Sequence, residues 1–318
     1  MKKIMRKRLS LRCMDIVDYL KMTDTELTEL NLACFGHTHS KERLESMIES
    51  DGRLPEWGGE LYGVEDGRLL GIVGLLYPRV ETKDGVRKVG GIRSVCTRPS
   101  ASREGVAERL MEYAHEILRE KVRYSFLMTS ASSIAHELYK KLGYEDIYTL
   151  PGAFKKRGKV ESNVRFRREK DPRYVRSVYK DSVKDLKGLV VREKDFWSMA
   201  ESRGWPNNEE VKIAYKDGEK IGYAMFSSSR GSLSVREIGA QEGYLDEILE
   251  GLESLTDKEY LVLSHVNPAY REDIEEKGYH WSDEQWSRVM VKDLHGGSDT
   301  LDIFGPSEKF HLGIYEAF

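Results

Sequence analysis

Two stretches of the chain share one hydrophobic pattern. Residues 60–77 and residues 211–226 each consist of two apolar runs separated by a short polar turn, Asp66-Gly67 in the first and Asp217-Gly218 in the second. An Asp-Gly pair between apolar runs is typical of a tight β-hairpin, because both residues accept the positive φ that such a turn requires. Each stretch therefore predicts a pair of antiparallel strands.

The hairpins are followed by the same order of elements in both halves of the chain. Each half continues with a helical segment, an apolar strand (residues 124–129 and 260–264), a second helical segment and a Gly-Tyr pair. Hairpins followed by alternating helices and strands are typical of a mixed sheet covered by helices. We expect an α/β protein with two related domains in tandem, each a mixed β-sheet flanked by helices.

The expected domain limits follow from the segments between and after these elements. The stretch 155–163 is polar and basic and has no apolar periodicity, so it is predicted to link a domain of residues 1–154 to one of residues 164–294. The tail of residues 295–318 is too short for a domain and is expected to pack on another part of the chain.

The composition is that of a folded, charge-rich protein. Of its 318 residues, 39% are hydrophobic and 33% charged, and the formal net charge is −3. A balanced charge favours neither nucleic acid nor a membrane surface as a partner. The basic residues at the start run into no apolar stretch long enough for a signal peptide or a membrane span. We therefore expect a soluble, cytoplasmic protein.

The cysteines and the paired histidines indicate no redox or metal site. Cys13, Cys34 and Cys96 are odd in number and widely spaced, which predicts reduced, structural thiols rather than a disulfide framework. His37 and His39 lie in a short polar segment without a nearby thiol or carboxylate pattern, so they are expected to be solvent-facing loop residues. No metal ligand is predicted.

The most informative stretch joins a strand to a helix. An apolar strand ends at Thr97, Pro99 stops it, and a turn containing Gly105 leads into a helix with one apolar stripe. Such a turn leaves backbone N–H groups unpaired at the positive end of a helix dipole, which is an arrangement that binds anions. By itself the turn is also compatible with an ordinary strand-to-helix connection.

A second motif downstream distinguishes these two interpretations. It comprises Ser132, Ala135, Leu138, Tyr139, Lys141, Gly143 and Tyr144. Together the two stretches resemble the Gcn5-related N-acetyltransferase (GNAT) family, whose cofactor loop reads Arg/Gln-x-x-Gly-x-Gly/Ala and whose later helix often reads Asn-x-x-Ala-x-x-Leu-Tyr-x-Lys-x-Gly-Phe/Tyr. Ser102 replaces the usual Arg or Gln and Ser132 the usual Asn, with Arg103 available as a substitute cation. The resemblance covers roughly residues 11–148.

Within the family, the strand of residues 89–99 and the second, degenerate domain look most like the Eis-type (enhanced intracellular survival) acetyltransferases. Those proteins usually end in a sterol-carrier-like domain, for which the tail of this chain is too short. The likeness to that subgroup is therefore partial.

The resemblance implies an acyltransferase that binds acetyl-CoA as co-substrate and transfers its acetyl group to a primary amine of a small molecule or peptide by direct attack in a ternary complex. Tyr139 corresponds to the general acid, although a helix tyrosine packed in the core is the common alternative. The implied cofactor-binding residues are Val95, Cys96, Thr97, Ser102, Arg103, Glu104, Gly105, Val106, Ala107 and Ser132.

The general base is less determined. Eis-type enzymes use their C-terminal carboxylate, which here belongs to Phe318, and Glu60 and Glu81 beside the first hairpin are alternatives. The acceptor itself cannot be derived from residue spacing.

The second half keeps the hairpin but not the cofactor loop. Its loop, residues 238–244, has acidic-flanked glycines and no basic residue, so this domain is expected to be non-catalytic and to shape the acceptor cleft or the interface of a homo-oligomer. Trp197, Trp205, Trp281 and Trp286 are expected either to line an amine site or, more commonly, to pack in the core. Two other functions remain open: an acyl-CoA-binding regulator without turnover, and a two-domain interaction scaffold.

Overall fold

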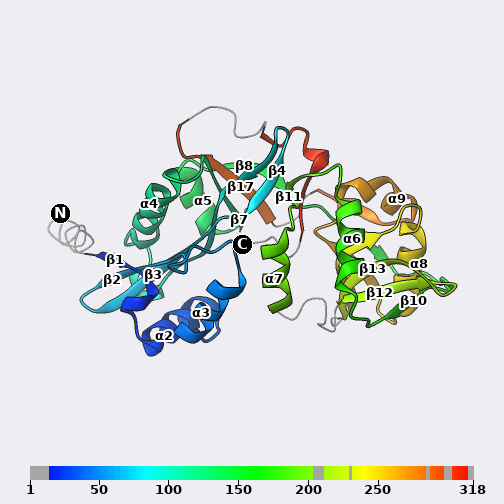
Figure 1. Ribbon diagram of the computed structural model, residues 1–318, viewed down its shortest axis with the longest axis horizontal. Coiled ribbons are helices and arrows are strands. Elements are labelled where there is room, and N and C mark those ends of the chain that lie inside the picture. Colours follow the sequence, from blue (N-terminus) through cyan, green and yellow to red (C-terminus); the bar gives the residue numbers. More distant parts are fainter. Residues whose placement is uncertain (1–13, 203–210, 229–230, 284–286, 297–302, 314–318) are drawn as a thin grey trace.

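The computed structural model describes residues 14–202, 211–228, 231–283, 287–296 and 303–313. These residues form two seven-stranded sheets and one four-stranded sheet, with helices packed on both large sheets (Figure 1). This is the mixed α/β arrangement expected from the alternating pattern.

The described residues of the first half form four α-helices and most strands of the first sheet. The elements are β1 (Asp15–Val17), α2 (Asp24–Phe35), α3 (Lys41–Ser50), β2 (Glu60–Glu65), β3 (Arg68–Leu76), β4 (Arg79–Thr82), β5 (Gly85–Lys88), β6 (Gly90–Thr97), α4 (Val106–Arg119), β7 (Tyr124–Ser130), α5 (Ile134–Lys141), β8 (Glu145–Thr149) and β9 (Gly152–Lys156).

The second half follows the same plan. Its elements are β10 (Arg165–Arg167), α6 (Pro172–Ser182), β11 (Lys187–Leu189), α7 (Lys194–Ser202), β12 (Val211–Lys216), β13 (Glu219–Ser228), β14 (Ser232–Ala240), α8 (Leu245–Leu255), β15 (Tyr260–Ser264), α9 (Arg271–Glu276), β16 (His280–Ser282), β17 (Ser287–Asp293) and β18 (Phe310–Leu312). Short 3₁₀ turns span Tyr19–Lys21, Pro99–Ala101, Pro268–Tyr270 and Ser307–Lys309.

Both predicted hairpins are confirmed. β2 pairs with β3 and β12 pairs with β13, in antiparallel register. At the turns Asp66 and Gly67 have φ of 51° and 73°, and Asp217 and Gly218 have φ of 50° and 88°. Two successive positive φ values are those of the type I′ turn, whose twist matches that of the flanking strands.

Each face of the first sheet is covered by a different set of helices. Leu110, Ala114 and Leu118 of α4 pack on one face in a buried cluster, while α2 and α3 cover the other face, where Leu27 and Leu44 are fully buried. Figure 1 shows α4 on one side of the strands and α2 with α3 on the other. The second sheet repeats this layout, with α8 on one face and α6 with α7 on the other.

The two sheets exchange a strand. The first has the order β1-β2-β3-β6-β7-β17-β8, and the second has the order β10-β12-β13-β14-β15-β9-β16. β17 of the second half therefore lies between β7 and β8 of the first half, with Val291 opposite Phe126, and β9 of the first half lies between β15 and β16. The segment 155–163 separates the two sequence repeats but not the two sheets, because apolar alternation identifies a strand without identifying its partner.

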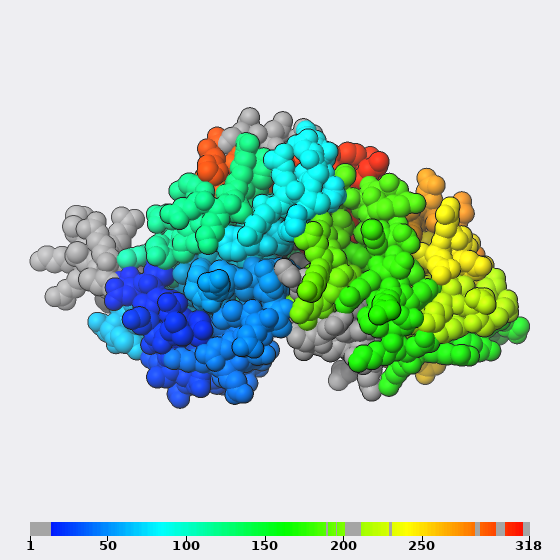
Figure 2. Space-filling model, viewed as in Figure 1, coloured from blue at the N-terminus to red at the C-terminus, as the bar shows by residue number. Residues whose placement is uncertain are grey.

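A third sheet joins the halves. It has the order β18-β11-β4-β5, so β4 of the hairpin that follows β3 pairs with β11 of the second half, and β11 in turn pairs with β18 of the tail. Figure 2 shows the cyan β4–β5 region in contact with the green second half. Phe310 and Leu312 of β18 are buried with Val80 and Phe126. This part of the tail packs on the core of the protein, as expected for a segment too short to fold alone.

The expectation of reduced thiols is wrong for two of the three cysteines. Cys34 near the end of α2 and Cys96 on β6 form a disulfide, with their Cα atoms 6.0 Å apart. The wide spacing of the cysteines in the sequence concealed this pair, because the packing of α2 on the sheet brings them together. Cys13 lies outside the described residues.

In the described part of the chain, no helix combines the length and the apolar character needed to cross a membrane.

Candidate active site

Two neighbouring parallel strands of the first sheet separate after a short pairing. β6 and β7 pair at Gly90–Ser125 and Gly91–Phe126, and in the described residues their ladder ends there. In the second sheet, β14 and β15 stay paired over four positions, from Ser232 to Val235. The backbone of β6 from residue 92 onward is therefore free of β7 and can bind another molecule along that edge.

A β-bulge marks the same part of β6. Ile72 of β3 pairs with Cys96, and Gly74 of β3 pairs with Arg93. Two residues of β6, Ser94 and Val95, therefore lie opposite the single residue Val73 of β3. Ser94 has a φ of 53°, which a non-glycine residue rarely adopts. Bulges re-aim backbone groups and are common beside active sites. The sequence analysis did not predict this bulge, because no local residue pattern indicates it.

The cofactor loop predicted from the sequence has the geometry of an anion site. Gly105, with a φ of 87°, is the N-cap residue of α4, and it offers no side chain to cap the first N–H groups of this 14-residue helix. Arg103, beside it in the loop, also has a positive φ, of 62°. The positive end of the helix dipole and the N–H groups of its first turn therefore remain available for a pyrophosphate.

The residues predicted around this loop lie at or beyond the C-terminal ends of β6 and β7, and the side chain of one of them is turned away from the loop. Val95 and Thr97 are on β6, and Ser132 follows directly after β7, so these positions flank the separation of the two strands. The Cys96 side chain, in contrast, is turned to α2 by the disulfide, so only its backbone can contact a cofactor.

Tyr139 lies on α5 in a largely buried position. Its ring packs edge-on against Tyr144, with the ring centroids 6.0 Å apart, and burial raises the pKa of its hydroxyl to about 12. The hydroxyl is therefore protonated at neutral pH, as a proton donor must be.

A cleft opens on the face of the sheet covered by α2 and α3. Its volume is about 460 Å³, and it is lined by side chains of these helices, of the loop between them, and of β2, β3 and β6, including Ser94 of the bulge. The cleft thus adjoins the strand that carries the predicted thioester contacts.

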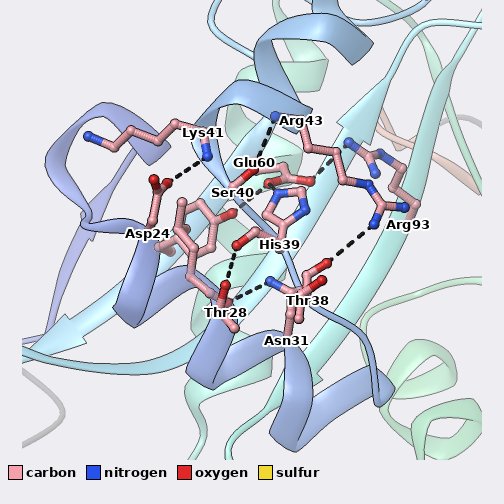
Figure 3. A network of polar contacts seen from close by, with 12 residues as sticks. Asp24, Thr28, Asn31, Thr38, His39, Ser40, Lys41, Arg43, Glu60 and Arg93 are labelled. Atoms are coloured by element: carbon pink, nitrogen blue, oxygen red, sulfur yellow. Dashed lines mark hydrogen bonds and ion pairs between the residues drawn. The ribbon is translucent and has the colours of Figure 1, made fainter.

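Glu60 is the centre of a buried polar network in this cleft (Figure 3). Its carboxylate accepts hydrogen bonds from Arg93 Nη2 at 3.1 Å and from the Tyr62 hydroxyl at 2.5 Å, and it lies 3.3 Å from Nε2 of His39. Burial alone would raise the pKa of Glu60, but the contact with His39 and the charge of Arg93 outweigh it and hold this pKa below its usual value. Glu60 is therefore a carboxylate at neutral pH.

The structure corrects the expectation for His39. Its side chain is only 7% exposed, and Thr28 of α2 donates a hydrogen bond of 2.5 Å to its backbone oxygen. Figure 3 shows the ring directed at Glu60 from the loop between α2 and α3. His37 is exposed, as expected, and stacks on Phe35. The partner of His39 is distant in sequence, so no local signal could have indicated its burial.

A comparison with known families identifies the domain that contains these residues. Residues 21–147 match the sequence profile of the family described as "Acetyltransferase (GNAT) domain". The chain contains a GNAT acetyltransferase domain. Its enzyme class is accordingly acyltransferase.

Solved structures share the fold of most of the chain. The GCN5-related N-acetyltransferase from Kribbella flavida superimposes with a TM-score of 0.61 at 18% identity, over 88% of this chain and 72% of that one. Eis1 from Mycobacterium abscessus gives 0.56 at 16% identity, over 88% and 74%. A putative acetyltransferase from Pyrococcus horikoshii gives 0.53 at 16% identity and covers 96% of both chains. No curated protein matches the chain by sequence.

Of the alternative bases, only Glu60 lies in the cleft of the GNAT domain. Glu81 is on β4 in the sheet that joins the halves, 3.3 Å from the Lys187 ammonium, and does not line the cleft. Phe318 lies outside the described residues.

The second half differs from the GNAT domain at the corresponding position. A cavity of about 980 Å³ lies at the N-terminus of α8, between α6 and α9, and its charged lining residues are Asp181, Lys184, Asp185, Glu242, Asp246 and Asp273. The five carboxylates outnumber the single cation, so this cavity would repel a pyrophosphate. Trp197 and Trp281 are buried core residues and form no exposed wall, while Trp205 and Trp286 lie outside the described residues.

Proposed function

We propose that this chain transfers the acetyl group of acetyl-CoA to a primary amine, by direct attack in a ternary complex on the first half. The proposal rests chiefly on one observation: β6 separates from β7 between an uncapped helix N-terminus and a cleft that contains a buried Glu60–His39 pair. The first feature suits a pyrophosphate and the second suits an amine, so the thioester would lie along β6 between them.

The cofactor would be held by backbone groups. The N–H groups of Arg103 and of residues 105–107 would bind the pyrophosphate, because the N–H of Glu104 already donates to the backbone oxygen of Ala101 at 3.3 Å. The strand backbone at Val95 and Thr97 would bind the pantetheine and the thioester carbonyl. The bulge at Ser94 breaks the regular ladder beside this carbonyl. Fixed backbone donors stabilise the negative charge that develops on a carbonyl oxygen without reorganising during the reaction.

The acceptor amine must be neutral to attack the thioester. Glu60, as a carboxylate, fixes the imidazole of His39 and stabilises positive charge on it, so that His39 can take the amine proton. The neutral nitrogen then forms a bond to the carbonyl carbon, and the carbon–sulfur bond breaks as the Tyr139 hydroxyl gives its proton to the departing thiolate. The nitrogen releases its second proton as the amide forms, Tyr139 regains a proton from solvent, and His39 returns the first proton to solvent. The second half would supply no catalytic group and would support the first sheet through β17.

The experiment is acetyl-CoA consumption followed by free-thiol release, with and without amines, in the wild type and in Tyr139→Phe. We expect amine-dependent release that falls by about 100-fold or more in Tyr139→Phe, with acetyl-CoA binding retained. Tyr113→Phe is the matched control, because Tyr113 is an exposed tyrosine on α4. Tight cofactor binding without release would instead identify an acyl-CoA-binding regulator, and absence of binding would identify a scaffold.

A further inference from the structure

The charges that line the cleft of the GNAT domain are not balanced. The cleft is lined by three arginines, Arg43, Arg53 and Arg93, and by two carboxylates, Asp51 and Glu60. Arg53 is fully engaged, because its Nε and Nη2 atoms each donate a hydrogen bond of 2.9 Å to Asp51, whose side chain is 3% exposed. The excess positive charge therefore resides on the other two arginines.

Arg93, which lines the cleft, is only partly paired. Its Nη2 atom contacts Glu60, but Nε is buried and has no hydrogen-bond partner in the described part of the protein. A guanidinium only donates, so the missing partner must be an acceptor atom. Gly74 of β3 makes room for the Arg93 side chain: a Cβ there would lie 2.7 Å from Cγ and 3.2 Å from Nε of Arg93.

Arg43 lines the same cleft from the start of α3. Its Nη1 atom donates to the backbone oxygen of Thr38 at 3.3 Å, and among the described residues no carboxylate lies within ion-pair distance of its guanidinium. Figure 3 shows Arg43 and Arg93 near each other, on the side of the network opposite Asp24 and Lys41. Two incompletely paired guanidinium groups thus lie beside the Glu60–His39 pair.

We propose that the acceptor is a small amine that carries its own carboxylate, and this proposal rests on the function proposed above. The carboxylate would accept hydrogen bonds from the guanidinium groups of Arg93 and Arg43, which would turn the amine toward His39. Guanidinium groups pair with carboxylates through planar, charge-assisted hydrogen bonds, so they suit this ligand well. A polyamine would place an additional ammonium against the same arginines and would be repelled.

The test compares two acceptors that differ only in the carboxylate, β-alanine and β-alaninamide, with spermidine as a third, by acetyl-CoA-dependent thiol release. We expect kcat/KM for β-alanine to exceed that for β-alaninamide by about 10- to 100-fold, the range expected for one charge-assisted contact. Arg43→Gln should reduce this preference mainly by raising the KM for β-alanine, and Arg43→Lys should retain part of it. Arg87→Gln, an exposed arginine on β5, should leave the preference unchanged.

The two levels of the proposal fail in different ways. If thiol release depends on an amine but kcat/KM for β-alaninamide or spermidine equals or exceeds that for β-alanine, the acceptor class is wrong and the acetyltransferase function stands. An undiminished preference for β-alanine in Arg43→Gln would also overturn the assignment of Arg43. If no amine supports release and acetyl-CoA does not bind, the proposed function fails, and the acceptor class fails with it.

Discussion

At the scale of single residues, the chemistry of the site depends on one buried carboxylate. Glu60 contacts His39, Tyr62 and Arg93, and these partners keep it ionised despite its burial. An ionised carboxylate is a weak base but an effective partner for an imidazole that gains a proton. Its role in the account is therefore to orient and support His39.

Replacing this carboxylate by an amide tests that role. We expect Glu60→Gln to lower kcat by about 100-fold and to leave the KM for acetyl-CoA nearly unchanged, because Glu60 faces the acceptor cleft. The matched control is Glu81→Gln, which removes the carboxylate of the sheet that joins the halves. Steady-state kinetics would disprove the role of Glu60 if both variants kept the wild-type kcat, and thermal unfolding shows whether each variant is folded.

At the scale of elements, the sequence predicts what is encoded locally. The hairpin turns at residues 66–67 and 217–218, the apolar stripe of α4 and the glycine before it are all visible in short windows, and the structure has them. The bulge at Ser94 and the burial of His39 depend on partners on other elements. The disulfide between α2 and β6 was missed for the same reason: its formation depends on packing rather than on spacing.

Gly105, in the turn before α4, should be needed for its positive φ as well as for its small size. Gly105→Ala places a Cβ at a φ of 87°, so we expect weaker acetyl-CoA binding, by about 10-fold, and a stability loss of about 1 kcal/mol. Gly67→Ala is the control, because Gly67 also has a positive φ, of 73°, but lies in the hairpin turn. Calorimetric titration should show weaker binding only in Gly105→Ala; equal affinities in both variants would contradict the cofactor loop.

The disulfide should stabilise the packing of α2 on the sheet. We expect the variant Cys34→Ala/Cys96→Ala to lose about 2–4 kcal/mol of unfolding free energy, because the cross-link closes a chain segment of 62 residues. Denaturant unfolding with and without a thiol reductant measures this. The wild type should be destabilised by the reductant and the double variant should not respond, whereas equal responses would contradict a role for this bond in stability.

At the scale of the whole molecule, the strand exchange makes the two halves dependent on each other. β17 provides backbone partners for both β7 and β8, and β9 does the same for β15 and β16. The repeats in the sequence gave no indication of this exchange, since an apolar strand segment does not identify the strand with which it pairs. The GNAT domain therefore needs a strand from outside the segment that matches its family.

A fragment of residues 1–163 should consequently fail to fold as a stable monomer. Without β17, the edges of β7 and β8 would expose unpaired N–H and C=O groups and the apolar face that Met290 covers. The matched control is the full chain cleaved at a protease site inserted near residue 161, whose two pieces should stay associated. Size-exclusion chromatography and circular dichroism would contradict the exchange if the fragment were monomeric and unfolded as cooperatively as the full chain.

The most direct test of acetyl transfer by this chain follows a labelled acetyl group. In a single turnover with acetyl-labelled acetyl-CoA, excess enzyme and an amine, we expect the label to appear on the amine, no label to stay on the protein, and Tyr139→Phe to slow the transfer. Label retained on the protein would contradict direct attack in a ternary complex, and absence of labelled amine from every acceptor tested would contradict acetyl transfer itself.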